Sequence, residues 1–390
     1  MNKKRIFVVF FIFLSFISVF ELGYFLGQKK NLCFFLENWD PLIFQQAYNK
    51  LKDMFVNERE IDDKKLFYGA LSGMVSSLND PYTQFFDPQK AMIFLEDATG
   101  EFGGIGIEIG VRQGLLTIIS PLEETPAQKA GLKAGDVIFM VDGRMVSQLP
   151  LDEVVSLIRG KPGTEVTLTI LREGWQEPVD FKIKREIIKI PTLKFEFLNS
   201  SQGSKVAYLK IFEFNENTLK NFKNIVPLIL KENTKKMILD LRGNSGGYLD
   251  TAKEIANYFL KNNEIILIEQ QKDKKKIHFA KNNGLFSDFH IVILVDRGTA
   301  SASEILAAAL RDNRGALLLG EKTFGKGSVQ TLERLSDGSL LKITFAHWLT
   351  PKEEKISEIG LNPDIEIKNE KEEQDLQLER ALKEIDLLKK

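Results

Sequence analysis

Three runs of apolar residues in the C-terminal half of the chain each end in a loop rich in glycine, serine or threonine. They lie at residues 236–241, 291–295 and 316–319. Short runs without polar alternation are typical of strands buried on both faces of a sheet. Helical patterns lie between them, at residues 249–260 and 301–311. The C-terminal half of the chain is therefore predicted to form a layered α/β domain.

The loops after these strands hold the residues that suit chemistry. They read DLRGNSGG at 240–247, DRGTASASE at 296–304 and GEKTFGKGSVQ at 320–330. Ligands and catalytic groups of α/β folds lie at such strand ends. Three such loops indicate a functional site more strongly than one does.

Ser301 is the candidate nucleophile. It follows a strand and a turn at the predicted start of a helix, where free N–H groups carry partial positive charge and would stabilise an oxyanion. A serine in this position is more often a plain helix cap, and Ser303 is a competing candidate. Gly246 and Gly247 leave the backbone open to a substrate carbonyl, although they would also suit a tight turn.

Lys326 is the candidate base for this serine. The three histidines of the chain, His278, His290 and His347, all fall outside the three loops. An ordinary lysine has a pKa of about 10.4, so burial would have to lower the pKa of Lys326 considerably. Lys322 in the same loop is the poorer candidate because its surroundings predict exposure.

The third loop also comes close to a nucleotide-binding P-loop, with Gly320 and Lys326 at the ends of a G-x-x-x-x-G-K match. Gly327, however, stands where that motif needs a serine or threonine to coordinate magnesium. The residues that follow, 328–332, are typical of a strand, whereas a P-loop opens a helix. A nucleotidase is therefore disfavoured.

Composition argues against other functions. The chain has 53 Lys plus Arg and 54 Asp plus Glu, so no overall field favours nucleic acid, and the lysines at 272 and 274–276 are interpreted as a solvated loop. The single Cys33 forms no intramolecular disulfide, and the three histidines are widely spaced. We expect no metal site and no cofactor.

The N-terminus predicts a membrane anchor. Lys3, Lys4 and Arg5 precede an almost wholly apolar run, residues 6–27, which has the length of about 20 residues that a membrane-spanning helix needs. Positive charge in front of it favours a cytoplasmic N-terminus. No small-residue cleavage signal follows, so a retained signal anchor is favoured over a cleaved signal peptide. The rest of the chain is expected outside the cytoplasm, in the periplasm.

Two further segments precede the α/β domain. Residues 40–80 show the i, i+4 apolar spacing of two helices without chemical groups on a common face, which favours packing or dimerisation. From residue 105 the apolar pattern alternates like a strand. Further strands and short helices are expected at 115–119, 127–130, 137–141, 151–158 and 166–171. This order predicts a small, partly open β-barrel.

With these motifs the chain resembles the C-terminal processing peptidases, also called tail-specific proteases, over residues 40–368. The most specific matches are GTASASEI at 298–305, GEKTFGKG at 320–327 and DLRGNSGG at 240–247. The resemblance implies a multidomain α/β serine endopeptidase with a PDZ domain and a core of crotonase- and Clp-protease-like layered fold. The loop at 350–354 departs from the family pattern, in which glycine and serine are more usual there.

The same resemblance implies a role for each residue of the site. Ser301 would be the nucleophile, Lys326 the general base, and Gln330 the residue that orients the lysine. Gly247 and Ala302 would supply the N–H groups of an oxyanion hole. The expected reaction is peptide hydrolysis through an acyl-enzyme intermediate.

The PDZ domain of the family is matched by the sequence FGGIGI at 102–107. Backbone N–H groups of such a loop hold a terminal carboxylate while the bound peptide adds as a strand, although glycines here would also suit a turn alone. The expected peptide-binding residues are Gly103, Gly104, Ile105, Gly106 and Ile107.

The predicted organisation is a signal anchor at 1–30, a helical region at 35–95, a PDZ domain at 96–186, a Ser/Lys peptidase core at 187–368 and an amphipathic helical tail at 369–390. Expected partners are proteins with accessible C-termini, the membrane, further copies of the chain and an activating adaptor. Two alternatives stay open: a catalytically silent PDZ adaptor and an acyl-CoA enzyme. The joint presence of Ser301, Lys326 and Gln330 argues against the first, and the anchor and PDZ module against the second.

Overall fold

The computed structural model describes residues 40–112, 114–147, 149–368 and 374–388. The chain divides into two units, Met1–Ala70 and Leu71–Lys390. In the first unit, α2 (Pro41–Met54) begins after Asp40, whose carboxylate accepts the Leu42 N–H. The 3-10 helix η1 (Glu58–Glu60) and the first half of α3 (Asp63–Ser76) follow. The two helices expected at residues 40–80 are present.

Apolar side chains of α2 are largely exposed, and none of its residues is buried. Within the described residues, no helix has the length and apolar character needed to cross a membrane. The predicted anchor at residues 1–30 lies outside the part of the chain that the structure describes.

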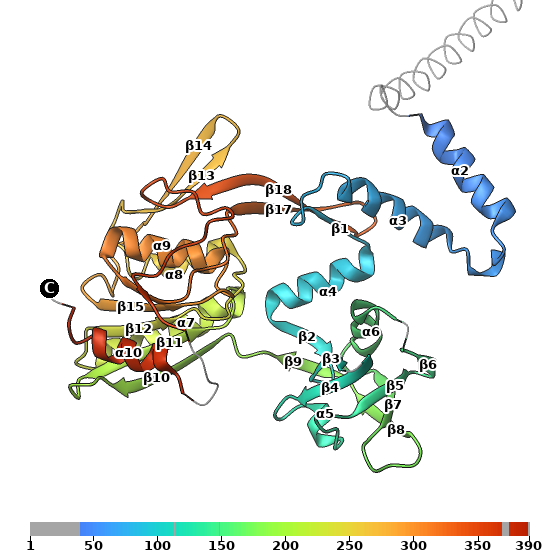
Figure 1. The fold of residues 1–390 in the computed structure, drawn as a ribbon, viewed down its shortest axis with the longest axis horizontal. Helices are drawn as coiled ribbons and strands as arrows, with labels where there is room; N and C mark the ends of the chain where they lie inside the picture. Colours follow the sequence, from blue (N-terminus) through green and yellow to red (C-terminus); the bar gives the residue numbers. More distant parts are fainter. Residues whose placement is uncertain (1–39, 113, 148, 369–373, 389–390) are drawn as a thin grey trace, which may run out of the picture. The chain divides into compact units, whose positions relative to one another are not determined.

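The second unit contains a small antiparallel sheet of order β3-β4-β5-β7-β8, with β6 paired to β5 (Figure 1). The elements are β3 (Ile107–Arg112), β4 (Leu115–Pro121), α5 (Pro126–Lys129), β5 (Val137–Val141), β6 (Arg144–Met145), α6 (Leu151–Ile158), β7 (Glu165–Leu171) and β8 (Val179–Lys184). The hydrophobic core of this sheet includes the fully buried side chains of Ile118, Leu168 and Ile170. The strand expected from residue 105 begins at Ile107, because Gly106 has a φ of +77° that breaks the extended run.

A six-stranded sheet of order β10-β11-β12-β15-β16-β19 forms the larger layered part of the second unit. Its strands are β10 (Leu193–Asn199), β11 (Lys205–Ile211), β12 (Lys236–Asp240), β15 (His290–Val295), β16 (Leu317–Gly320) and β19 (Ile365–Glu366). Pairing is antiparallel only between β10 and β11 and parallel elsewhere. The three buried strands predicted from the sequence are β12, β15 and β16.

Helices cover both faces of this sheet. One face packs against α7 (Glu216–Lys231), α8 (Leu249–Ala256) and α9 (Ala302–Arg314), through a core that includes Phe222, Ile255 and Leu306. The other face packs against α10 (Leu376–Glu384), which lies within the predicted helical tail (Figure 1). The helix expected at 249–260 is shorter than predicted, since turns replace it after Ala256.

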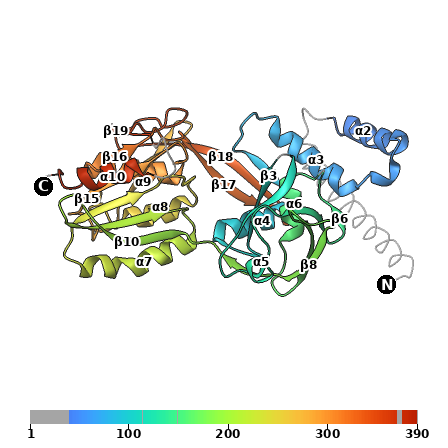
Figure 2. The ribbon, with the colours of Figure 1, turned by 60° about the horizontal axis from the view of Figure 1, so that its bottom comes forward.

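A second sheet, of order β1-β18-β13-β14 with β17 paired to β18, carries the lysine loop. Its strands are β1 (Gln84–Phe86), β13 (Ile265–Gln271), β14 (Lys274–Phe279), β17 (Ser328–Arg334) and β18 (Leu340–Leu349). Figure 2 shows β17 and β18 side by side, as their antiparallel register requires. Between β1 and the small antiparallel sheet, the chain forms α4 (Pro88–Thr99) and β2 (Glu101–Gly104), which pairs with β9 (Glu186–Lys189).

Candidate active site

Ser301 lies in a strained turn between β15 and α9. Its φ of +56° and ψ of −118° are unusual for a residue with a Cβ. The turn is fixed from both sides, since the Ala300 N–H donates to the Asn244 carbonyl at 3.0 Å and the Phe324 N–H donates to the Thr299 carbonyl at 3.0 Å. Strain of this kind is found where surrounding structure holds a side chain in place for function.

The glycine loop after β12 lies directly against this turn. A Cβ on Gly246 would come within 2.7 Å of the Ser301 Cβ, and one on Gly247 within 2.3 Å of the Phe214 carbonyl oxygen. Both glycines also have positive φ, 111° and 128°. Glycine is therefore required at both positions by close approach as well as by backbone conformation.

Two backbone N–H groups are available beside the serine. Among the described residues, neither the Gly247 N–H nor the Ala302 N–H donates to a protein acceptor. The Ser301 N–H, by contrast, donates to Glu304 Oε2 at 2.9 Å. The two residues that the resemblance assigned to an oxyanion hole thus line the same pocket as Ser301.

Glu304 joins the serine turn to the lysine loop, a connection that our sequence analysis missed. Its Oε1 accepts the Thr323 hydroxyl at 2.5 Å and the Gly325 N–H at 2.8 Å, and its Oε2 accepts the N–H groups of Ser301 and Lys326, both at 2.9 Å. The side chain is buried. Burial raises the pKa of the Glu304 carboxyl, and the four donors act in the opposite direction.

Lys326 stands at the end of this loop, just before β17. Burial lowers the pKa of Lys326, and the positive charge of Lys342 lowers it further, while Asp80 and Glu304 act in the opposite direction. Its Nζ lies 4.9 Å from the centre of the Tyr82 ring. No hydrogen bond joins its ammonium to Ser301 in this arrangement of the described residues.

The backbone around Lys326 is held by hydrogen bonds to Trp348. The Lys326 carbonyl accepts the Trp348 Nε1–H at 2.9 Å, and the Trp348 N–H donates to the Gly327 carbonyl at 3.0 Å. Lys322, the alternative base, is exposed. Gln330 lies on β17, and its Nε2 donates to the hydroxyls of Ser328 at 2.9 Å and Thr344 at 3.3 Å. Among the described residues, no hydrogen bond joins Gln330 to Lys326.

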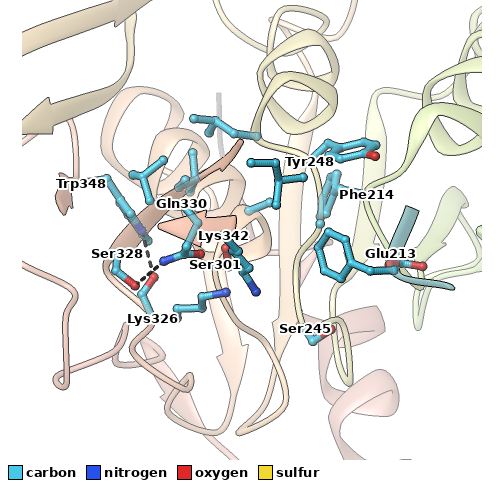
Figure 3. A pocket seen from close by; sticks show the side chains of 17 residues that line it. Glu213, Phe214, Ser245, Tyr248, Ser301, Lys326, Ser328, Gln330, Lys342 and Trp348 are labelled. Atoms are coloured by element: carbon cyan, nitrogen blue, oxygen red, sulfur yellow. Dashed lines mark hydrogen bonds between the residues drawn. The ribbon is translucent and has the colours of Figure 1, made fainter. Parts of the chain in front are cut away.

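These residues line one cavity of about 430 Å³ (Figure 3). Figure 3 shows the side chains of Ser301, Lys326 and Lys342 near one another. Most of the remaining lining is apolar and comprises Phe94, Phe214, Tyr248, Leu249, Ala302, Ile305, Val329, Leu332 and Trp348. The cavity therefore combines polar groups around Ser301 with an apolar lining that suits an apolar side chain.

Ser303 and the histidines lie away from this chemistry. Ser303 is fully buried, and its hydroxyl donates to the Asn244 carbonyl at 3.0 Å. His278 pairs with Glu269, and of the described residues that line the cavity none is a histidine. Within the same part of the chain, no group of three His, Cys, Asp or Glu residues has the arrangement of a metal site.

Four of the five expected peptide-binding residues, Gly104, Ile105, Gly106 and Ile107, line a separate cavity of about 220 Å³. It is bounded by the Gly104–Ile107 backbone, by Ile109 of β3, and by Val155, Ile158 and Arg159 at the end of α6. A Cβ on Gly106 would come within 2.4 Å of the Thr125 side chain. Gly103 lies outside this lining, and its carbonyl accepts the Gly160 N–H at 3.1 Å.

Comparison with known proteins agrees with this geometry. Residues 205–367 match the family described as Peptidase family S41, residues 117–172 match a PDZ domain, and residues 36–90 match the activating protease CtpB N-terminal domain. The chain is 40% identical over 309 residues to the carboxy-terminal-processing protease of Bartonella bacilliformis, covering 78% of this chain and 70% of that protein. The chain belongs to the S41 family of carboxy-terminal processing proteases.

Other members of the family agree. The carboxy-terminal processing protease CtpB of Bacillus subtilis is 37% identical over 325 residues, 83% of this chain and 67% of that protein. A solved photosystem II D1 C-terminal processing protease aligns with a TM-score of 0.54 at 29% identity, over 84% of this chain and 88% of that one. The chain spans between 65% and 70% of the length of the first curated relatives that it matches.

The family membership makes this S41 protein a carboxy-terminal processing serine protease with N-terminal helices, a PDZ domain and a protease core built on a mixed, largely parallel sheet. A PDZ-containing protease of this kind implies protein substrates that present their C-termini.

Proposed function

We propose that Ser301 is the nucleophile and Lys326 the general base of this S41 protease. The observation that carries the proposal is the single cavity that holds the strained Ser301, the Gly247 and Ala302 N–H groups, and a half-buried lysine of lowered pKa. Each suits acyl transfer: a presented hydroxyl, donors for the oxyanion, and a lysine whose neutral, basic form is favoured by burial.

The reaction then proceeds in two balanced steps. Ser301 Oγ attacks the scissile carbonyl carbon while its proton passes to the neutral Lys326 Nζ, and the oxyanion accepts the Gly247 and Ala302 N–H groups. Lys326 returns the proton to the leaving amine as the peptide bond breaks, which leaves an acyl-enzyme. In the second step Lys326 takes a proton from a water molecule as the water oxygen attacks the acyl carbon, and it returns the proton to Ser301 Oγ as the ester bond breaks and the product acid leaves. Because the lysine side chain is long and flexible, rotation of its torsions brings Nζ from the Tyr82 ring to the serine, where Gln330 would orient it.

The PDZ cavity is proposed to capture the substrate's free C-terminus. The short backbone stretch Gly104–Ile107 offers N–H groups to a carboxylate, and β3 offers an edge to which a peptide adds as a strand. The apolar side chains of Ile107, Val155 and Ile158 suit an apolar last residue. Positive φ and the contact with Thr125 require glycine at position 106.

We further propose that the protein is held by a single-pass N-terminal anchor in the inner (plasma) membrane, with its protease core outside the cytoplasm, in the periplasm. The core is proposed to have the crotonase- and Clp-protease-like layered fold. The basic residues before the apolar run at 6–27 support the anchor. The exposed apolar side chains of α2 support self-association into dimers or larger oligomers. An activating adaptor protein is part of the same proposal.

Covalent labelling of the nucleophile tests the catalytic assignment. A fragment that begins at residue 31 is mixed with an unfolded protein and with a fluorophosphonate probe, and the intact mass and modified peptide are measured. We expect cleavage of the protein and one probe adduct, on Ser301. Absence of both in the correctly folded fragment would favour the silent PDZ adaptor instead.

Free and amidated peptides of the same sequence test the PDZ assignment. We expect the amidated peptide to be turned over at least about tenfold more slowly, because the carboxylate is the group that the Gly104–Ile107 loop would bind. Replacement of Gly106 by a bulky charged residue should remove the difference. Equal turnover of the two peptides by the unaltered protein would show that the PDZ domain does not select for a free C-terminus.

A further inference from the structure

Arg242 lies at the start of the loop that carries Gly246 and Gly247, and its guanidinium is hydrogen-bonded to two carboxylates. Its Nε and Nη2 donate to Asp240 at 3.0 and 2.7 Å, and its Nη1 and Nη2 donate to Asp375 at 2.7 and 2.8 Å. The side chain is only 12% exposed. Two bidentate pairs fix both the position and the plane of a guanidinium, which a single contact does not.

Asp240 is itself held in the core. Its side chain is fully buried and its Oδ2 accepts the Tyr208 hydroxyl at 2.7 Å. Its Oδ1 also accepts the backbone N–H of Arg242 at 3.0 Å. Asp240 therefore fixes the start of the loop from the end of β12.

Asp375 comes from a different part of the chain, the N-cap of α10. Its Oδ1 accepts the Leu378 N–H at 3.0 Å, so the carboxylate caps the helix and binds Arg242 at the same time. Ala381 and Ile385 of this segment are fully buried against one face of the large sheet. The pair of hydrogen bonds from Arg242 to Asp375 is therefore supported by a helix that is packed against the sheet.

The loop beyond Arg242 has little freedom to move independently. The Gly243 N–H donates to Asp296 Oδ1 at 2.9 Å, and buried Asn244 donates from its amide to the Ile211 carbonyl at 2.9 Å. The Asn244 side chain then accepts the Gly246 N–H at 2.9 Å. A displacement of Arg242 is thus passed along a short, hydrogen-bonded segment toward Gly247.

We propose that Asp375 is a positioning residue for catalysis: it holds Arg242, and through Arg242 it holds the glycine loop that places the Gly247 N–H beside Ser301. This inference rests on the proposed role of Gly247 as an oxyanion donor. The C-terminal helix thereby supports the active site as well as covering the sheet. Oxyanion donors act through preorganised geometry, so a loosened loop weakens transition-state binding more than substrate binding.

The same segment offers a matched control at its other end. Asp386 is fully buried in its side chain and pairs with Lys236 at 2.7 Å, and it accepts the Gln202 N–H at 2.9 Å. This pair anchors the end of the α10 segment to the large sheet without touching the loop at 240–247. Asp375→Asn and Asp386→Asn each remove one ion-paired negative charge from the segment, Asp375 being 39% exposed in its side chain and Asp386 fully buried. An asparagine at 375 still caps the helix.

The experiment compares the two variants in the full chain, at a temperature well below both unfolding transitions. Hydrolysis of a peptide gives kcat and KM, and a peptide boronic acid, which forms a tetrahedral adduct with an active-site serine, reports binding of the oxyanion geometry. We expect Asp375→Asn to lower kcat about tenfold, with KM within about twofold, and to weaken boronate binding by a similar factor, because the donor is displaced rather than removed. Asp386→Asn should lower Tm and leave kcat and boronate binding unchanged.

Two results would overturn the inference. One is an unchanged kcat in Asp375→Asn, and the other is an equal loss of kcat in both variants, which would make the helix merely stabilising. Asp375→Glu, which keeps the charge, should recover part of kcat if the ion pair is what matters. Failure of the proposed function looks different: the unaltered protein would then form no boronate adduct on Ser301, and Ser301→Ala would retain activity.

Discussion

The serine and the lysine of the proposed catalytic pair are held in different ways. Ser301 lies in a strained turn that is bound by Glu304 and contacted by Gly246. Lys326 has a backbone fixed by Trp348, whereas its ammonium lies over the Tyr82 ring. The serine side is built from short backbone hydrogen bonds, and the lysine side from burial and charge.

This difference teaches which part of the site is preorganised. Oxyanion donors that are already in place need no rearrangement at the moment of reaction. The base instead depends on a flexible side chain whose protonation is set by its surroundings. We therefore expect changes on the serine side to alter kcat at every pH, and changes around the lysine to alter the pH dependence.

The largest effect is expected from removal of the nucleophile. Ser301→Ala should lower kcat by about 10⁴-fold or more, because the covalent route is lost. Ser303→Ala should retain activity, since the Ser303 hydroxyl is committed to the Asn244 carbonyl. Peptide hydrolysis and PDZ-peptide binding are measured on both variants. An inactive Ser303→Ala beside an active Ser301→Ala would reverse the assignment.

Removal of the base should come next in size. Lys326→Arg keeps a positive charge but cannot deprotonate at working pH, so kcat should fall by about 10²- to 10⁴-fold. Lys322→Arg, in the same loop and exposed, is the matched control and should be unaffected. The comparison is made by steady-state hydrolysis of one peptide. Substantial activity in Lys326→Arg would exclude the lysine as base and return attention to the histidines.

The link between the two sides is tested through Glu304. Glu304→Gln replaces an acceptor of four hydrogen bonds by an amide whose N–H₂ faces other donors, so we expect a loss of about 1–3 kcal/mol in the free energy of unfolding. Because it loosens the serine turn and the lysine loop together, kcat should fall about tenfold or more as well.

Glu321→Gln is the control for that substitution. Glu321 pairs at 3.0 Å with the exposed Arg297, and surface pairs contribute little. Tm and kcat are measured on both variants. If Glu304→Gln lowered Tm without changing kcat, Glu304 would be a folding residue only.

The sequence predicted which loops form the serine side and that Lys326 lies in the third loop, but not the residues that surround the lysine side chain. The loops at 240–247 and 296–304 follow buried strands, so local pattern and strand order were enough to bring them together. The role of Glu304 was not predicted, although Ser301 and Glu304 have the S-x-x-E spacing of a capping box. That spacing could have identified Glu304 as a partner of the serine turn. Which residues surround Lys326 depends on how β1 and β17 pair with β18, and the local apolar pattern does not encode that pairing.

Two of these neighbours illustrate the limit. Lys342 reaches the cavity only through the register of β17 with β18, in which Leu332 pairs with Lys342. Asp80 and Tyr82 approach because β1 joins the edge of β18, where Gln84 pairs with Lys342. Neither pairing follows from apolar periodicity, since a register shift of one residue would place different side chains in the cavity.

The smallest expected effect is a shift in the pH profile of activity, caused by changing the charges around Lys326. It tests the comparison of the serine and lysine sides most directly, because only the electrostatic surroundings of the base change. The charged groups that act on Lys326 are Lys342 from β18, Asp80 from the turn after α3, and Glu304 from α9. Lys342 lowers the pKa of Lys326, so its removal should raise that pKa. At a given pH less of the base would then be neutral, and the rise of kcat/KM should move to higher pH in Lys342→Met. Lys342→Arg retains the charge and should leave the profile in place, while Asp80→Asn should move it to lower pH, because Asp80 acts in the opposite direction.

The plateau at high pH should be similar in all three if Lys342 acts only through charge. A lowered plateau with an unmoved midpoint in Lys342→Met would show instead that Lys342 contacts the substrate. Its substitution would then lower activity at every pH, as we expect for changes on the serine side.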